Sequence, residues 1–427
     1  MFESLKSNRI AEVLLLLNLI TLPLAEHWSS KALLITLLFV LYGFYRKYKI
    51  EFPKMGLLYI LIFIFVGFSY FWSANKSNTL LGIVSLLPFL LFTIAYKQII
   101  AITSLKRILR ITAFVFLFYG FLMIILAFVR FLKISDYETF YYHALTEPFK
   151  ANAIYIALIY GQLYLFLLYQ LLFVSTKNRS IDYILVISLF TFQLLLSSKL
   201  IFSILIFISI IFFLYYIRNK GVSIRKLLLG SVIGTSLFLL IVISTFTKNR
   251  FKEIADVKQI ENVFTQNYFG PGYYLNGLTL RLFQLRCLYE IEKEKDFNSF
   301  LGTGFKASQP LLNQKYAQYD LYRGPIGEGE NDGYFVFNFH NQYAQFLIEL
   351  GIFGLIIILL MFHFLMINPL INKNILLFGV GFLFLSFALT ESYLLRQKGV
   401  VSFVLFSLLA EQYISKAVKK VLEKELN

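Results

Sequence analysis

Cysteine is almost absent from this chain of 427 residues, which contains Cys287 alone. A single cysteine cannot form an intrachain disulfide, and it makes a cysteine-rich metal site implausible. The sequence also lacks the HExxH spacing of zinc hydrolases and the acidic loop of an EF-hand, and its acidic residues are scattered. Nothing in the sequence therefore demands a metal ion or another cofactor.

Signatures for nucleotide binding and for serine hydrolysis are missing as well. Neither a GxGxxG fingerprint nor a GxxxxGK phosphate loop occurs, and there is no GxSxG turn. The short stretch Gly302-Thr303-Gly304 forms a glycine turn, which alone says little about nucleotides. The chemistry of this chain has to be sought elsewhere.

Acidic residues are few, since 24 Asp and Glu stand against 40 Lys and Arg, for a formal net charge of +16. Such an excess can indicate nucleic-acid binding, but here the basic residues are concentrated in short connectors and in the C-terminal tail. Connectors poorer in positive charge alternate with them, which is the positive-inside pattern of membrane proteins. The charge therefore mostly reports topology, and we expect no nucleic-acid partner. The basic positions are Arg46, Lys47, Lys49, Lys54, Lys97, Lys106, Arg107, Arg110, Lys177, Arg179, Arg218, Lys220, Arg225, Lys226, Lys416, Lys419, Lys420 and Lys424.

Hydrophobic residues, in contrast, make up 58% of the chain and include 48 Phe and 28 Tyr, and the mean hydropathy is +0.71. A soluble domain of this length could not bury so much apolar surface, whereas spans of about 20 apolar residues can place it in lipid. The apolar runs are unbroken and do not alternate as barrel strands do. The sequence therefore predicts an all-α polytopic membrane protein surrounded by membrane lipids.

Twelve apolar runs are expected to form transmembrane helices. The first lacks a small-residue cleavage site and is followed closely by another, so we interpret it as a retained helix and not as a removed signal peptide. Two neighbouring runs are separated only by Ser197-Ser198-Lys199. An even number of spans with basic inner connectors places both termini in the cytoplasm. The runs lie near residues 10–25, 31–45, 55–72, 78–96, 111–130, 151–174, 182–197, 199–217, 227–246, 343–366, 374–391 and 398–414.

This topology divides the chain into spans 1–9 (residues 1–246), a periplasmic loop (247–342), spans 10–12 (343–415) and a basic cytoplasmic tail (416–427). The loop contains eleven basic and eleven acidic residues, unlike the basic inner connectors. A loop of this length in a compact protein is usually functional or disordered. Its aromatic content and a helical pattern of leucines over 278–289 predict an ordered, partly helical cap.

The polar stretch Phe-His-Asn-Gln-Tyr at residues 339–343 lies where this loop re-enters an apolar run, and Glu349 follows two turns deeper. Polar groups at such a boundary are costly and often functional. Histidine is the side chain best suited to proton transfer near neutral pH, which makes His340 a candidate catalytic base. The alternative is that these groups only satisfy neighbouring helices at the interface.

Three cations are candidates for an anionic ligand. Arg281 and Arg286 lie on the expected helix of the loop, and a guanidinium matches phosphate oxygens. A salt bridge to a nearby acid such as Glu290 is the better interpretation of Arg286, whereas Arg281 has few acids near it in the sequence. Lys199 stands between two apolar runs, where it either extends to the interface or contacts a phosphate.

These motifs resemble the O-antigen ligase/polymerase superfamily of bacterial envelope glycosyltransferases. The similarity is strongest from the His340-Asn341-x-Tyr343 start to the spaced glycines after Glu349, and it extends to the helix of Arg281 with the glycine turn that follows. Weaker similarities are Phe71-Trp72-Ser73, Pro148 to Asn152, Ser197-Ser198-Lys199, Thr390-Glu391-Ser392 and Arg396-Gln397-Lys398-Gly399. The superfamily more often has arginine at the position of Lys199. Lysine keeps the positive charge but cannot make the bidentate contact of a guanidinium with a phosphate.

The resemblance implies a twelve-span enzyme of the bacterial inner membrane that moves a glycan en bloc from undecaprenyl pyrophosphate to an acceptor hydroxyl, without a nucleotide sugar. By this resemblance His340 is the catalytic base, and the pyrophosphate is held by Arg281, Lys199 and Arg286. Contacts to the sugars or to the acceptor, lipid A-core or another glycan, come from Asn341, Tyr343, Tyr334 and Glu349.

Two alternatives remain open at this stage. A polymerase of the same superfamily would join repeat units on the carrier, with the same donor chemistry as a ligase. A transporter or flippase for a lipid-linked glycan would also suit twelve spans, although the sequence shows no parallel halves and no matched pair of broken helices.

Overall fold

The computed structural model describes residues 2–101, 104–174, 179–220, 257–324 and 333–425. These residues are almost entirely helical and contain no strand, which confirms the predicted all-α class. The expected span at 227–246 lies outside the described residues. The helices are α1 (Phe2–Thr21), α2 (Glu26–Tyr45), α3 (Lys54–Phe68), α4 (Lys76–Ser85), α5 (Leu87–Ala95), α6 (Leu105–Ile134), α7 (Tyr142–Thr146), α8 (Ala153–Phe173), α9 (Arg179–Leu196), α10 (Lys199–Lys220), α13 (Val257–Thr265), α14 (Gly277–Glu292), α15 (Gln309–Gln318), α16 (Gln342–Leu350), α17 (Ile352–Phe362), α18 (Asn368–Ile371), α19 (Ile375–Phe387) and α20 (Gln397–Glu425).

Several of these helices have an asparagine as their N-terminal capping residue. The side-chain oxygen of the residue before the first turn accepts backbone N–H groups that have no partner within the helix. Asn152 caps α8 in this way, and Asn276 and Asn341 cap α14 and α16. The two last-named caps matter for function, because α14 and α16 carry the candidate site residues Arg281 and Tyr343.

Eight described helices are long and apolar enough to cross a membrane, which agrees with a polytopic membrane protein. The helix α19 is apolar but only 13 residues long. The total of twelve spans therefore stays a prediction. The eight helices are Glu26–Tyr45, Lys54–Phe71, Lys76–Ile100, Leu105–Ile134, Ala153–Phe173, Arg179–Leu196, Lys199–Asn219 and Ile352–Ile371.

The structure differs from the sequence-based prediction at the expected span 343–366. Two helices occupy this region, because Gly351 adopts a φ of +53° and ends α16. The spanning helix begins only at Ile352. Glu349 therefore belongs to the short helix α16 and not to a membrane span.

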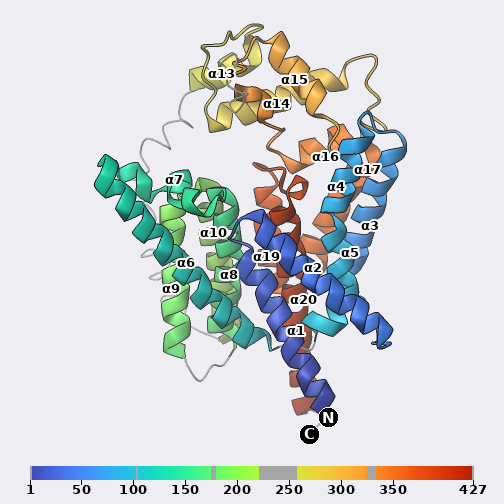
Figure 1. Ribbon diagram of the computed structural model, residues 1–427, viewed down its shortest axis with the longest axis vertical. Helices are drawn as coiled ribbons and strands as arrows, with labels where there is room; N and C mark the ends of the chain where they lie inside the picture. Colours follow the sequence, from blue (N-terminus) through green and yellow to red (C-terminus); the bar gives the residue numbers. More distant parts are fainter. Residues whose placement is uncertain (1, 102–103, 175–178, 221–256, 325–332, 426–427) are drawn as a thin grey trace.

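The helices form two outer groups around a central one (Figure 1). In this view α6 to α10 stand on one side and α3 to α5 with α17 on the other, whereas α1, α2, α19 and α20 lie between them. The central α20 packs against α5, α8 and α19. Helices α13, α14 and α15 form a cap at one end of the molecule, and the two chain ends lie at the opposite end. The short helix α16 lies between the cap and the membrane helices.

The C-terminal end of α16 is capped by the glycine turn that follows α14. The backbone N–H of Thr303 donates to Ile348 O (3.0 Å), and that of Gly304 donates to Glu349 O (2.8 Å). These bonds satisfy carbonyl groups that a helix end leaves without partners. Gly302 has a φ of +70°, and a Cβ there would lie 2.6 Å from the carbonyl carbon of Glu349. Glycine is thus required for a close backbone approach.

Candidate functional site

His340 immediately precedes the capping residue of α16 and has an unusual backbone conformation. Its φ is +42°, in the left-handed region that non-glycine residues seldom adopt. The backbone N–H of His340 donates to Asn338 Oδ1 (2.9 Å), and Asn341 Oδ1 accepts the N–H groups of Tyr343 and Ala344 (3.0 Å each). Two asparagines therefore hold the histidine in this conformation. Strained backbone held by its surroundings is frequent at active sites.

Glu391, in the loop between α19 and α20, faces this histidine. Its Oε1 lies 3.4 Å from His340 Nδ1. The glutamate side chain is 7% exposed and that of the histidine 19%, so the imidazole is the more accessible partner. The loop is bonded directly to α16, since Gln342 N donates to Ala388 O (2.8 Å) and Asn341 Nδ2 donates to Leu389 O (3.2 Å).

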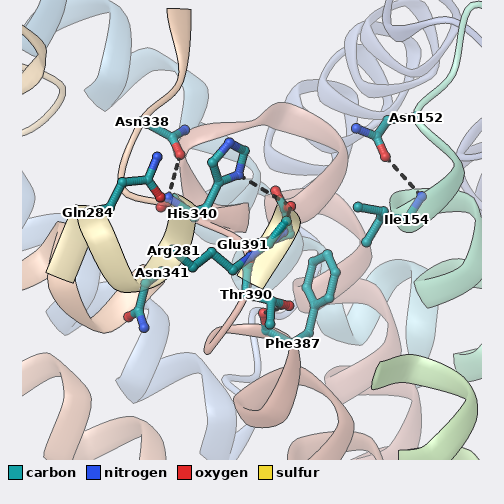
Figure 2. Close-up of polar contacts among 12 residues, drawn as sticks. Asn152, Ile154, Arg281, Gln284, Asn338, His340, Asn341, Phe387, Thr390 and Glu391 are labelled. Atoms are coloured by element: carbon teal, nitrogen blue, oxygen red, sulfur yellow. Dashed lines mark hydrogen bonds and ion pairs between the residues drawn. The ribbon is translucent and has the colours of Figure 1, made fainter. Parts of the chain in front are cut away.

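Arg281 joins the pair from the cap (Figure 2). Its Nη2 lies 3.2 Å from Glu391 Oε1, its Nε donates to Thr390 O (3.0 Å), and its Nη1 donates to Gly277 O (2.6 Å). The sequence suggested few acids near Arg281, but an acid 110 positions away completes its surroundings. We define Arg281, His340 and Glu391 as the cap-base cluster. It is assembled from three separate segments of the chain.

The carboxylate is stabilised in its ionised form. Burial alone would raise the pKa of Glu391, but the hydrogen bond and charge of His340, followed by the charges of Arg281 and Arg396, hold that pKa below its ordinary value. Arg396 is exposed and lies at the end of the same loop. An ionised carboxylate at this distance can fix the orientation of the imidazole.

A second polar group of side chains lies on the buried face of α16. Glu349 Oε1 accepts from Ser308 Oγ (2.9 Å) and from Gln345 Nε2 (2.6 Å). Ser392 Oγ, from the loop of Glu391, donates to Gln345 Oε1 (3.3 Å). Burial raises the pKa of Glu349 to about 7, against the opposing effect of its hydrogen bonds.

The remaining residues singled out from the sequence have their own partners. Arg286 pairs with Glu290 (2.9 Å) and donates to Val263 O and Gln266 O (2.7 Å each), all within the cap. Lys199 is the first residue of α10 and is half-buried.

Two tyrosines from the same set use their hydroxyl groups for structure. Tyr343 donates to Leu385 O (2.7 Å), which ties α16 to α19. The hydroxyl of Tyr334 accepts from Leu275 N (2.9 Å) within the cap. Both rings are half-buried, so part of each ring stays accessible.

The sequence did not predict two residues that act on His340. Glu391 stands out only within the short similarity Thr390-Glu391-Ser392, and no sequence pattern singles out Asn338, which accepts the backbone N–H of His340. An isolated acid before an apolar run is a weak signal, because only the fold reveals which distant cation it meets. Among the described residues, no group of three or more His, Cys, Asp or Glu side chains is placed to hold a metal ion.

Comparison with known sequences bears on this region directly. Residues 183–359 match the family described as O-antigen ligase. The matched segment includes α14, the glycine turn, His340 and α16, and it excludes the loop of Glu391. No curated protein matches the chain significantly. The family match confirms the resemblance predicted from the motifs.

Proposed function

Because residues 183–359 place this chain in the O-antigen ligase/polymerase superfamily, we propose that it transfers a glycan en bloc from undecaprenyl pyrophosphate to a hydroxyl group of lipid A-core or a similar acceptor. The observation that carries this proposal is the cap-base cluster, in which a histidine, a carboxylate and an arginine meet beneath the cap. The position of both chain ends opposite the cap (Figure 1) supports cytoplasmic termini and a periplasmic site in the bacterial inner membrane.

His340 is the general base of the proposed reaction. When Nδ1–H points to Glu391, the other ring nitrogen is free to accept a proton. The acceptor oxygen attacks the anomeric carbon of the donor glycan, its proton passes to His340 Nε2, and the bond from the anomeric carbon to the pyrophosphate oxygen breaks. The electron pair of that bond leaves with the pyrophosphate. Glu391 orients the imidazole and stabilises the positive charge that it acquires.

Arg281 is placed to stabilise the departing pyrophosphate. A guanidinium has five N–H donors, and the three contacts of Arg281 use three of them. Two donors remain for phosphate oxygens. Lys199, at the start of α10, is the proposed second cation. Arg286, the third candidate cation, is held by contacts within the cap, which favour a structural role for it.

Asn341 and Tyr343 hold α16 in place, and α16 in turn positions His340. Asn341 uses its oxygen to cap the helix and its amide to hold the loop at Leu389. Tyr343 and Tyr334 each retain a partly accessible ring face for a sugar. The apolar membrane helices offer a suitable surface for the polyprenyl chain.

A repeat-unit polymerase would use the same cluster, because the donor chemistry is the same. Cells that lack the gene distinguish the two activities. Loss of a ligase leaves long polymer on the lipid carrier, whereas loss of a polymerase leaves single repeats. If such cells accumulate single repeats on the carrier, the protein is a polymerase and not a ligase.

The enzymatic activity itself is tested with purified protein in nanodiscs. The donor is lipid-linked glycan extracted from cells that lack the gene, and the readout is glycan transferred to the acceptor. Transfer by the wild type but not by His340→Ala supports the proposal. Wild-type protein that moves the donor between leaflets without forming product would instead indicate a flippase.

A further inference from the structure

A partly open cavity of about 300 Å³ lies beside the cap-base cluster, and its lining combines polar and apolar side chains. It is bounded by α4, by the segment after the glycine turn and by the buried face of α16. Its lining includes Asn78 and Leu81 of α4, Lys306 and Ser308, and Gln345 and Glu349 of α16. This size is at the lower end of the range for small-ligand pockets, roughly 300–1,000 Å³.

The floor of the cavity is made of deeply buried polar side chains. Glu349 is 1% exposed and Gln345 is 2% exposed. Among the described residues, Glu349 Oε1 accepts from Ser308 and Gln345, whereas Oε2 has no hydrogen-bond partner. The backbone N–H groups of Lys306 and Ser308 lie near this carboxyl group and lower its pKa. A buried carboxyl oxygen without a partner is unfavourable. An unsatisfied buried group that lines a cavity points to a ligand that donates a hydrogen bond.

Lys306 adds a donor at the wall of the same cavity. Its Nζ donates to Ser85 Oγ (3.3 Å), and burial lowers its pKa from the ordinary value. The cavity therefore presents an ammonium group, an unpaired carboxyl oxygen and side-chain amides. This mixture of donors and acceptors differs from the all-donor surface that phosphate requires. Leu81, Val336 and Leu395 add apolar surface to the same lining, so the cavity is amphipathic.

The cavity adjoins the proposed reaction centre. Asn338 lines it and also accepts the backbone N–H of His340. Ser392, next to Glu391, donates to Gln345 in the floor. A group bound in the cavity would thus lie beside the base and not at a remote surface.

We propose that this cavity is a subsite for one sugar ring of the glycan substrates, with a ring hydroxyl donating to Glu349 Oε2 and Lys306 donating to a ring oxygen. The proposal deepens the function proposed above and rests on it for the source of the sugar. Sugar hydroxyls both donate and accept hydrogen bonds, which matches the mixed lining. The ring belongs either to the donor glycan or to the acceptor.

The first experiment tests sugar binding without requiring transfer. Full-length protein in nanodiscs is mixed with glucose, N-acetylglucosamine or glucuronic acid, and binding is followed by saturation-transfer NMR. Leu81→Trp is designed to fill the cavity from α4 and is expected to abolish the signal. Leu80→Trp is the matched control, since Leu80 is similarly exposed on the same helix but does not line the cavity. Equal signals from both variants, or no signal from the wild type, would overturn the proposal.

The second experiment identifies the source of the ring. Glu349→Gln keeps the side-chain shape but replaces the free acceptor oxygen by an amide donor. We expect the KM for one substrate, donor or acceptor, to rise about tenfold, as for the loss of one hydrogen bond, with kcat near that of the wild type. The substrate affected is the one that occupies the cavity. Unchanged KM values for both substrates would refute the proposal, whereas wild-type protein that binds sugars but transfers nothing would refute only the proposed function.

Discussion

His340 Nδ1 and Glu391 Oε1 lie 3.4 Å apart, although one residue precedes α16 and the other follows α19. A carboxylate in this position can select which imidazole nitrogen carries the proton, and the second ring nitrogen does not take part in this contact. The same arrangement of a base with an orienting carboxylate recurs in hydrolases of unrelated fold. Here the carboxylate is also shared with Arg281, which couples His340 to the cap.

Replacing His340 by glutamine should abolish transfer. A positioned base contributes about 10²–10⁴-fold to a rate, and glutamine cannot take up the proton. Expression level and apparent melting temperature should stay close to those of the wild type, because His340 is partly exposed. His363→Gln is the matched control, since His363 is exposed on the π-helical turn at the end of α17. Near wild-type transfer by His340→Gln would eliminate His340 as the base.

Glu391→Gln should lower kcat while the KM values stay unchanged, because the glutamate orients the base without touching a substrate. It should also destabilise the protein by about 1–3 kcal/mol near neutral pH, the cost of losing charged hydrogen bonds. A coincident tenfold rise in donor KM would instead show that Glu391 contacts the donor.

The stability effect of Glu391 should depend on pH with a defined sign. The neighbours Arg281, Arg396 and His340 hold the pKa of Glu391 below 4.5 in the folded protein. Its stabilising contribution is therefore complete above pH 4.5 and is lost as the pH falls through the lowered pKa. Melting curves of wild type and Glu391→Gln should converge on acidification below pH 4.5. A difference that persists unchanged at lower pH would contradict the ion-pair interpretation.

Arg281→Lys should reduce transfer by about 10²–10³-fold, as for the loss of a preorganised charge partner. Lysine keeps the charge but cannot reach Gly277 O, Thr390 O and Glu391 together while still offering donors to phosphate. The measurement is single-turnover transfer at saturating donor. Arg286→Lys serves for comparison, since it should chiefly lower the stability of the cap. If the two variants lost transfer equally without loss of stability, both arginines would belong to the donor site.

Gly302→Ala should destabilise the site by about 1–3 kcal/mol, because alanine is strained at a φ of +70° and its Cβ would collide with the backbone of Glu349. The cap of α16 would loosen, and transfer should fall with stability. Gly67→Ala in α3 is the control, because a Cβ there meets nothing within 4 Å. Equal melting temperatures for the two variants would show that the glycine turn is not under steric constraint.

The sequence was sufficient to predict the helical membrane fold, because apolar runs and basic connectors are local properties. It also singled out His340 and Arg281 as candidates, since each stands out against its neighbours, and the structure brings both to Glu391. The position of Glu391 could not be predicted, because it depends on how α19 returns beneath the cap. The break at Gly351 was missed for a related reason: the apolar pattern continues through it, and only the contact with Phe300 and the glycine turn requires two helices there.

The late position of Glu391 in the chain has a consequence for biogenesis. A nascent protein that has inserted everything through α17 already contains His340 and Arg281, but it lacks the carboxylate that brings them together. The backbone bonds from Gln342 and Asn341 to the segment 388–389 are also missing at that stage. The cap-base cluster can therefore form only after α19 and the loop that carries Glu391 have been synthesised.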